Sequence, residues 1–361
     1  MAESNAFSLP TEIEGITSDW LETALSGYAP GVRVRGFEKV DFINTTCTKI
    51  RLKLDLENNR EDAPIPETVI LKGGFEPHSR AMWTMHFTET HSYSTLMPAA
   101  GMRTPVAYFS EWDEAAKQGI VIMEDLVARG VEFCSPIKPQ GFEEIARRLK
   151  ELARLHALDY GSKELDPGGR WDWLDDTPAN LLVYFDHFLQ PDIWNDYLAS
   201  PRGAAVSTRF HDRHWMRDAL AKTGVFSRGL PYATCHGDTH LGNLYIDIDG
   251  EPGFFDSLPH ISAAMQEITY HITNALDVPD RRAHERDLVA HYRYELASHG
   301  VEVPSLDELM RQFGIFLANG YMIFIVNASE FQPEAINTAY TARYSAAMLD
   351  HDTMGLIAEL G

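Results

Sequence analysis

Two short stretches decide how this chain folds. Residues 235–243 read Cys-His-Gly-Asp-Thr-His-Leu-Gly-Asn, and residues 253–257 read Gly-Phe-Phe-Asp-Ser. Between them, a run of alternating apolar and polar residues is followed by turn-forming residues at 249–253. The sequence therefore predicts a β-hairpin whose two outer ends carry Asn243 and Asp256.

The ends of this hairpin carry oxygen ligands. Asn243 offers an amide oxygen and Asp256 a carboxylate, and hard ligands of this kind suit Mg²⁺. Asp238 precedes Asn243 on a glycine-containing loop, where a carboxylate beside a metal can accept the proton of an attacking hydroxyl. Each of these residue types is common in loops as a cap or turn former, so the interpretation depends on their order around the hairpin. That order predicts a phosphoryl-transfer site.

At these residues the sequence resembles the aminoglycoside phosphotransferase and choline kinase family, which includes ecdysteroid-kinase-like members and is related to the protein kinases. The family's catalytic loop reads His-Gly-Asp, four further residues and Asn, as residues 236–243 do. The resemblance implies an α+β, protein-kinase-like fold with a β-rich N-terminal lobe and a mostly helical C-terminal lobe. It also implies Mg²⁺-dependent transfer of the γ-phosphate of ATP to a small-molecule hydroxyl. Asp238 would be the catalytic base, and Asn243 and Asp256 the metal ligands. Glu267 stands where the longer family signature usually has Asp.

The resemblance further implies a lysine that reaches the phosphates. Lys72 ends the apolar, β-branched run at residues 67–72, which predicts a buried strand. A lysine there can reach the α- and β-phosphates when an acidic residue on a packed helix orients it. Helical spacing over residues 83–91 places Glu89 on such a helix, and Glu76 is the competing choice.

The loop that should cover the nucleotide departs from the family pattern. Residues 36–54 predict two strands joined around Asn44-Thr45-Thr46, with no glycine in the turn. Close approach of the backbone to phosphate is therefore harder. The hydroxyls of Thr45, Thr46 and Thr48, or backbone amides of this turn, are the alternative contacts, and the nucleotide affinity could be low or altered.

A linker follows the next predicted hairpin. Residues 105–109 and 119–123 predict its strands, and the second strand runs directly into the linker. In the resembled family the backbone of this linker binds the adenine edge. The resemblance thus implies an adenine site lined by Met123, Glu124, Asp125 and Leu126. We expect a nucleotide-binding lobe over residues 1–126 and a catalytic, substrate-binding lobe over residues 127–361.

Residues 168–216 form the expected acceptor region, because they lie between a predicted central helix and the catalytic loop and are rich in aromatic residues. Among these aromatic residues are Trp171, Trp173, Tyr184, Phe185, Phe188, Trp194, Tyr197 and Trp215. Aromatic residues in a helical insert are commonly core residues, whereas a cleft lined with them favours an apolar or ring-shaped alcohol. Asp186, Asp192 and Asp196 favour amines instead. An aminoglycoside-like substrate, an amino alcohol and an apolar ring alcohol therefore all stay open.

Length, charge and composition narrow the class of protein. The 361 residues exceed what one hydrophobic core usually organises, so two domains are expected. The net charge of −22 argues against a nucleic-acid partner and is compatible with a cationic substrate, although solubility alone accounts for such a charge in most proteins. With no apolar run of about 18 residues and no signal peptide, we expect a cytoplasmic enzyme without a membrane partner. Its three cysteines are too few for a disulfide framework.

Two other classes of protein compete with the kinase interpretation. His236, Asp238 and His240 could place three ligands around Zn²⁺ in a metal-dependent hydrolase, although that scheme leaves Asn243 and Asp256 without a purpose. The other class is a catalytically silent nucleotide-binding protein on a kinase-like scaffold. Its support is the glycine-free turn.

Overall fold

The computed structural model describes residues 7–44 and 47–360, and the chain divides into two compact units. Unit 1 comprises Met1–Glu132, Asp247–Asp249 and Phe254–Leu258. Unit 2 comprises Phe133–Ile246, Gly250–Gly253 and Pro259–Gly361. The functional lobe boundary expected after residue 126 stays a prediction.

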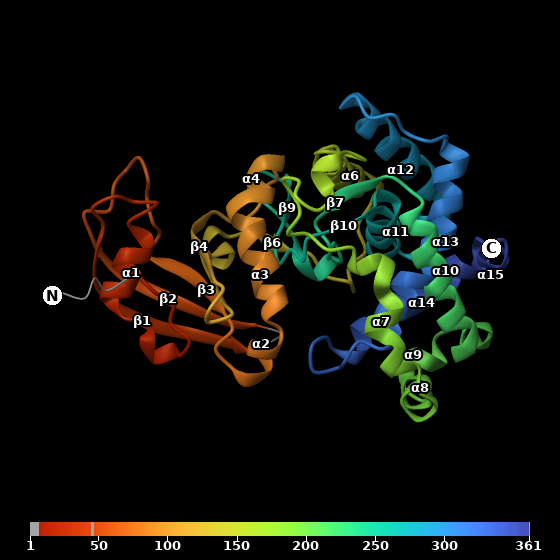
Figure 1. The fold of residues 1–361 in the computed structure, drawn as a ribbon, viewed down its shortest axis with the longest axis horizontal. Helices are drawn as coiled ribbons and strands as arrows, with labels where there is room; N and C mark the ends of the chain where they lie inside the picture. Colours follow the sequence, from red (N-terminus) through yellow and green to blue (C-terminus); the bar gives the residue numbers. More distant parts are fainter. Residues whose placement is uncertain (1–6, 45–46, 361) are drawn as a thin grey trace. The chain divides into compact units, whose positions relative to one another are not determined.

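Unit 1 is built on a five-stranded antiparallel sheet (Figure 1). Across the sheet, the strands are β1 (Arg33–Asn44), β2 (Thr48–Glu57), β3 (Thr68–Gly73), β5 (Gln118–Glu124) and β4 (Ala107–Asp113). Burial alternates along β2, so that Ile50 and Leu52 enter the core while Lys49 and Arg51 lie on the opposite face. This alternation gives one face of the sheet a row of basic side chains.

Short helices accompany this sheet. They are α1 (Ser18–Leu25), α2 (Pro77–Ala81), α3 (Trp83–His91), α4 (Met97–Ala100) and α5 (Leu126–Arg129), with a 3₁₀ turn at Ile13–Gly15 and a π-helical turn at Ser92–Leu96. Helix α3 packs against β4 and β5. A Cβ atom at Gly119 would lie 2.8 Å from the backbone carbonyl oxygen of His86, so this glycine permits the close approach of α3 to β5. The helix that carries Glu89 is thereby fixed against the sheet.

Unit 2 is mostly helical (Figure 1). Its α-helices are α6 (Phe142–His156), α7 (Leu181–Phe185), α8 (Pro191–Leu198), α9 (Pro201–Ala204), α10 (Arg213–Arg228), α11 (Ala264–Ala275), α12 (Val278–Ser298), α13 (Leu306–Ile325), α14 (Glu334–Asp350) and α15 (Thr353–Ala358). Short 3₁₀ turns lie at Lys163–Leu165, Thr177–Asn180, Asp186–Leu189, Thr208–Phe210 and Leu241–Asn243. Helix α13 is buried on nearly every side and packs on α11 and α14, so it forms the centre of this unit.

Two small sheets frame the catalytic-loop sequence. Strand β7 (Tyr232–Cys235) pairs antiparallel with β10 (His260–Ala263), and β6 (Glu132–Phe133), β8 (Leu244–Ile246) and β9 (Pro252–Phe254) form the other sheet in that order. The adjacency of β8 and β9 confirms the predicted hairpin, although β9 begins at Pro252, within the segment expected to form the turn. Gly237 has φ +92°, a conformation that glycine adopts without strain, so the chain turns sharply after β7.

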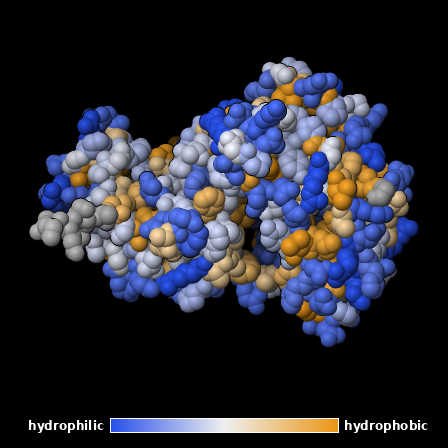
Figure 2. All heavy atoms as spheres, viewed as in Figure 1, coloured by the Kyte–Doolittle hydropathy of each residue, from blue (hydrophilic) through white to orange (hydrophobic). Residues whose placement is uncertain are grey.

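Hydrophilic residues dominate the face drawn in Figure 2, where hydrophobic residues form small separate groups. Within residues 7–44 and 47–360, no helix combines the length and hydropathy needed to cross a bilayer. Cys47, Cys134 and Cys235 form no disulfide in the part of the chain that the structure describes.

Candidate active site

Unit 1 brings three of the predicted site residues together around one ammonium group. Lys72, on β3, forms an ion pair with Glu89 of α3, and its Nζ lies 2.6 Å from Oδ1 of Asp256. Only 4% of the Lys72 side chain is exposed, and 9% of the Glu89 side chain. Of the two acidic partners considered for Lys72, the lysine therefore pairs with Glu89 and not with Glu76, which lies before α2.

Lys49 is a fourth member of this cluster, and no motif in the sequence points to it. Its Nζ lies 2.5 Å from Oδ2 of Asp256, so each oxygen of that carboxylate meets a different lysine. The antiparallel register sets Lys49 on β2 directly opposite Lys72 on β3. Like charges in that position repel each other, so the carboxylates of Asp256 and Glu89 are what make the arrangement stable.

The ionised state of Asp256 depends on these lysines. Burial opposes the charge of Asp256, but the charges of Lys49 and Lys72 and the hydrogen bonds from them outweigh burial and lower the pKa of Asp256. Burial also works against the charge on Lys72, and Asp256 and Glu89 reverse that effect and raise the pKa of Lys72 well above its ordinary value. Both groups are therefore charged at neutral pH.

The backbone at Asp256 is itself unusual. Its φ of +52° lies in the left-handed region, which Asp tolerates better than most residues. The Asp256 backbone N–H donates to the hydroxyl of Tyr93 over 3.3 Å, and Ser92 and Ser257 share a hydrogen bond of 2.6 Å beside it. These contacts within unit 1 hold the carboxylate toward the lysines.

Unit 2 holds the catalytic-loop residues. The side-chain nitrogen Nδ2 of Asn243 donates to Oδ2 of Asp238 over 2.7 Å and to the Asp238 backbone carbonyl over 3.0 Å. The hydroxyl of Tyr270, on α11, donates to Oδ1 of the same carboxylate over 2.9 Å. Asp238 is thus oriented from both sides, while about a quarter of its side chain stays exposed.

Tyr270 is a second residue of the site that the sequence motifs do not identify. It stands three positions after Glu267 on α11, so the two side chains share one face of that helix. That spacing is the signal that could have identified it.

His240 completes the surroundings of Asp238. Its Nδ1 accepts a hydrogen bond of 2.9 Å from the backbone N–H of Gly242, and its Nε2 lies 3.5 Å from Oδ2 of Asp238. Burial raises the pKa of Asp238, but His240, the hydrogen bond from Tyr270 and the charge of His236 together lower it below its ordinary value. Asp238 is therefore a carboxylate at neutral pH and can accept a hydrogen bond from a hydroxyl.

Glu267 supports the loop from beneath. Its Oε1 accepts from the backbone N–H of Gly237 over 2.7 Å, and its Oε2 accepts from the N–H of His236 over 3.1 Å. His156 Nε2, at the end of α6, lies 2.8 Å from Oε2. Burial opposes the charge of Glu267, but the hydrogen bond and charge of His156, with the charge of His236, lower the pKa of Glu267 to about 2.

The donor set of the predicted metal ligands suits a hard divalent cation. Asn243 uses its amide nitrogen on Asp238, which leaves its carbonyl oxygen as the ligand atom. Asp256 contributes carboxylate oxygens. Oxygen donors of this kind fit Mg²⁺ better than zinc.

The predicted adenine linker has its own internal contacts. Met123 is buried in β5, the Glu124 backbone N–H donates to the carbonyl of Val106, and the Asp125 side chain pairs with Arg51 over 2.8 Å and caps α5. The Leu126 carbonyl accepts from Gly130. The role of Met123, Glu124, Asp125 and Leu126 around an adenine stays a prediction.

Of the three threonines predicted to contact phosphate around the glycine-free turn, the structure describes Thr48. Thr45 and Thr46 lie outside the described residues. Thr48 is fully buried at the start of β2, so its hydroxyl is not presented at the surface of this structure.

The chain is similar to known proteins in its fold but not detectably in its sequence. No protein-family model matches, and no curated protein sequence matches. A solved structure from Ralstonia eutropha JMP134, assigned as an aminoglycoside phosphotransferase, superposes with a TM-score of 0.54 at 13% identity, covering 93% of this chain and 98% of that one. Choline kinase from Cryptosporidium parvum Iowa II superposes with a TM-score of 0.51 at 12% identity, covering 94% of this chain and 98% of that one. The chain has the fold of these small-molecule kinases. The predicted α+β, kinase-like fold class is confirmed, and at this level of identity the likeness concerns the fold.

In this kinase-like fold, the expected acceptor region is less buried than a core segment would be. Trp171, Trp194 and Phe210 are core residues and Tyr184 is 56% exposed, whereas the remaining aromatic side chains of this region are half-buried, namely Trp173, Phe185, Phe188, Tyr197 and Trp215. Asp186 forms an ion pair with Arg217, so its charge is already compensated. Asp192 and Asp196 are exposed on α8.

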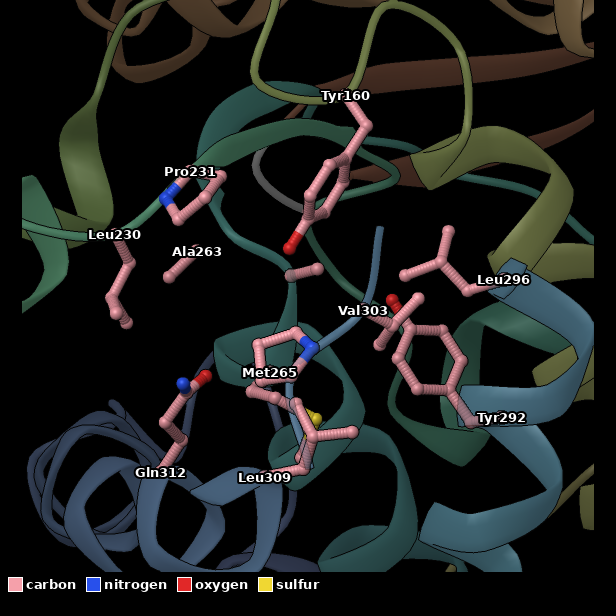
Figure 3. Close-up of a pocket in the computed structure, with 12 residues that line it drawn as sticks. Tyr160, Leu230, Pro231, Ala263, Met265, Tyr292, Leu296, Val303, Leu309 and Gln312 are labelled. Atoms are coloured by element: carbon pink, nitrogen blue, oxygen red, sulfur yellow. The ribbon is translucent and has the colours of Figure 1, made fainter. Parts of the chain in front are cut away.

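A small cavity in unit 2 is not a credible acceptor site. Tyr160, Pro231, Met265 and Tyr292 are among the residues that line it, and the Tyr160 ring points into it (Figure 3). About 20 Å³ is open to the centres of water molecules, which is room for about one water. None of the predicted site residues lines this cavity.

The zinc-hydrolase alternative gains no support. Among the described residues, the group of three potential ligands that lie close enough to share a metal is His156, Cys235 and Glu267, not the set of histidines around Asp238. Burial raises the pKa of Cys235 well above its ordinary value, which keeps the thiol protonated and unsuited to a metal. Glu267 already accepts the backbone hydrogen bonds of the loop. This group is structural.

Proposed function

We propose that the protein is an ATP-dependent phosphotransferase that acts on a hydroxyl of a small molecule. The observation that carries the proposal is the buried Lys72 ammonium between Glu89 and Asp256. Burying a lysine between two carboxylates costs desolvation free energy, so such an arrangement indicates a functional role for the lysine. An ammonium group oriented in this way is suited to pair with the phosphates of a nucleotide. The kinase-like fold supports the same conclusion.

In the proposed reaction, Asp238 receives the acceptor hydroxyl. Asn243 and Tyr270 hold the Asp238 carboxylate by one oxygen each, so its orientation is set before an acceptor arrives. As the acceptor oxygen forms its bond to the γ-phosphorus, the bond from that phosphorus to the bridging oxygen of ADP breaks. The hydroxyl proton passes to Asp238.

In the proposed function, a second group of residues acts on the phosphates of the nucleotide. Lys72, oriented by Glu89, would pair with phosphate oxygens of the bound nucleotide. Asn243 and Asp256 would hold Mg²⁺, which when bound neutralises charge on the β- and γ-phosphates. Glu267 keeps the loop backbone in place through the amides of residues 236 and 237.

Three classes of small molecule are candidates for the phosphate acceptor. The two superposed structures are named for aminoglycoside and choline chemistry, and a net charge of −22 is compatible with such cationic acceptors. The half-buried aromatic side chains of residues 168–216 favour a ring-shaped alcohol instead. We therefore propose a panel of aminoglycosides, amino alcohols and apolar ring alcohols.

The test is incubation of the protein with ATP, Mg²⁺ and each member of this panel, with mass-spectrometric detection of products. We expect one acceptor class to gain a phosphoryl group in molar equivalence to the ADP formed. Nucleotide binding without any phosphorylated product would favour the catalytically silent alternative. Failure of the protein to bind ATP, ADP or GTP would contradict the proposed function.

A further inference from the structure

Both carboxylate oxygens of Asp256 are in contact with a lysine ammonium group. Lys72 Nζ lies 2.6 Å from Oδ1, and Lys49 Nζ lies 2.5 Å from Oδ2. A divalent cation and an ammonium compete for the same carboxylate oxygen, because both are held there by charge and each repels the other. For Asp256 to bind a metal, at least one of these lysines must leave it.

The two lysines differ in how firmly they are held. The Lys72 side chain is 4% exposed and also forms an ion pair with Glu89. If Lys72 left Asp256, it would therefore still be paired with Glu89. Lys49 is 23% exposed, and Asp256 is the one ion-pair partner recorded for it among the described residues. Lys49 is therefore the lysine with the freedom to move, and it needs a new anion when it does.

We propose that Lys49 is a movable clasp on Asp256, which leaves the carboxylate for a nucleotide phosphate and thereby opens Asp256 to a divalent cation. This proposal rests on the proposed function, since it assigns the anion to the nucleotide. The phosphates carry the negative charge that a displaced ammonium requires, and a charge-assisted hydrogen bond to them replaces the one lost at Asp256. Metal binding at Asp256 then depends on the presence of nucleotide.

The sequence around Lys49 is consistent with this role. The sequence predicted to form the preceding turn lacks the glycine that lets a backbone approach phosphate closely. Lys49 stands at the second residue of β2, directly opposite Lys72. The backbone of a turn without glycine is poorly suited to contact phosphate. The ammonium group of Lys49, at the start of β2, can make a phosphate contact in its place.

The test uses two separate titrations of the full chain, each with one ligand. Mn²⁺, which is visible by electron paramagnetic resonance, is titrated without nucleotide, and ADP is titrated by calorimetry in the presence of a chelator. For Lys49→Met we expect Mn²⁺ to bind about tenfold more tightly and ADP about tenfold more weakly, the effect of one charge-assisted hydrogen bond. Opposite changes of this kind cannot come from partial unfolding, which would weaken both.

Two further variants serve as controls. Lys53→Met removes an exposed lysine from the same face of β2, where it pairs with Glu67, and should leave both affinities unchanged. Lys49→Arg keeps the charge and should stay close to the unmodified protein in both titrations.

The outcomes separate this proposal from the proposed function. Mn²⁺ affinity that stays the same or falls in Lys49→Met would overturn the clasp, and so would unchanged ADP affinity. If neither the unmodified protein nor any variant binds ADP, the proposed function is contradicted, and the proposal for Lys49 that rests on it is contradicted as well.

Discussion

The two halves of the proposed site, one group of residues in each unit, are assembled in different ways. In unit 2, Asp238 is held by Asn243 only 5 residues away and by Tyr270 32 residues away. In unit 1, Asp256 meets Lys72 across 184 residues of sequence and Lys49 across 207. One half is a local motif braced by one helix, and the other depends on the register of a sheet and a distant return of the chain.

The chemistry of the two halves differs as well. Asp238 is oriented mainly by neutral donors, an amide and a phenol, which need no counter-charge. Asp256 is held by two ammonium groups, and in the proposal made above that of Lys49 exchanges this carboxylate for a nucleotide phosphate. The comparison therefore predicts a rigid half that positions the acceptor and a responsive half that changes its ion pairs on ligand binding.

The largest effect on stability is expected at Glu267, which supports the rigid half. Its pKa of about 2 in the folded protein lies below the ordinary 4.5, so its contribution is present above pH 4.5 and is lost as the pH falls from 4.5 toward 2. For Glu267→Gln we expect a loss of about 3 kcal/mol in the free energy of unfolding at pH 7. Urea titrations at several pH values should show this loss shrinking toward zero below pH 4.5.

Glu302→Gln is the matched control for that prediction, because it replaces an exposed glutamate and should change the unfolding free energy by less than about 0.5 kcal/mol. A difference between Glu267→Gln and the unmodified protein that does not vary with pH would contradict the bracing role of the ionised Glu267 side chain.

The next effect concerns the responsive half. Glu89→Gln removes one of the two carboxylates that orient Lys72, while Asp256 keeps the lysine paired. We expect the KM for ATP to rise about tenfold, since one charge-assisted hydrogen bond is lost. Steady-state kinetics at saturating acceptor would measure it.

Glu76→Gln tests the alternative partner of Lys72 with the same chemical change. Glu76 lies before α2 and is not paired with Lys72, so we expect its KM for ATP to match the unmodified protein. Equal effects of the two substitutions would show that the pairing of Lys72 with Glu89 does not govern nucleotide binding.

The smallest effect is expected at Tyr270. Tyr270→Phe removes the hydrogen bond to the ionised Asp238 but keeps the ring that stacks on Phe324 at 5.6 Å. Since that hydrogen bond helps lower the pKa of Asp238, its loss should raise that pKa and move the acid limb of the pH–rate profile to higher pH. At neutral pH we expect kcat to fall about threefold.

Tyr294→Phe provides the comparison for Tyr270→Phe, because Tyr294 is 70% exposed on α12. Its pH–rate profile should coincide with that of the unmodified protein. An acid limb that stays in place in Tyr270→Phe would mean that the phenol does not act on Asp238.

The sequence could predict the rigid half because its information is local. The spacing of Asp238 and Asn243, the alternation that follows and the turn at residues 249–253 are all contained in a short segment. Lys72 and Glu89 were accessible for a similar reason, since a strand-ending lysine and a helical glutamate lie 17 residues apart. The spacing of three positions from Glu267 indicates that Tyr270 shares a helix face with that residue, but the sequence does not show that this face turns toward the loop.

Lys49 could not be predicted in the same way. Its role depends on the strand register that sets it opposite Lys72 and on the return of the chain that brings Asp256 to both. Neither is encoded in a periodicity or a motif. In the acceptor region, Trp171 and Trp194 are core residues, as expected for aromatic residues in a helical insert, whereas Tyr184 is exposed. The burial of each ring depends on tertiary packing, which the sequence pattern does not encode.

Asp238→Asn tests the central claim most directly, with ATP affinity in the presence of Mg²⁺ and phosphoryl transfer measured on the same preparation. The amide cannot accept the hydroxyl proton, so transfer to the acceptor should fall at least about 1,000-fold. ATP affinity should stay within about twofold, because the charged residues around Lys72 are unchanged. Normal turnover in this variant would contradict the account.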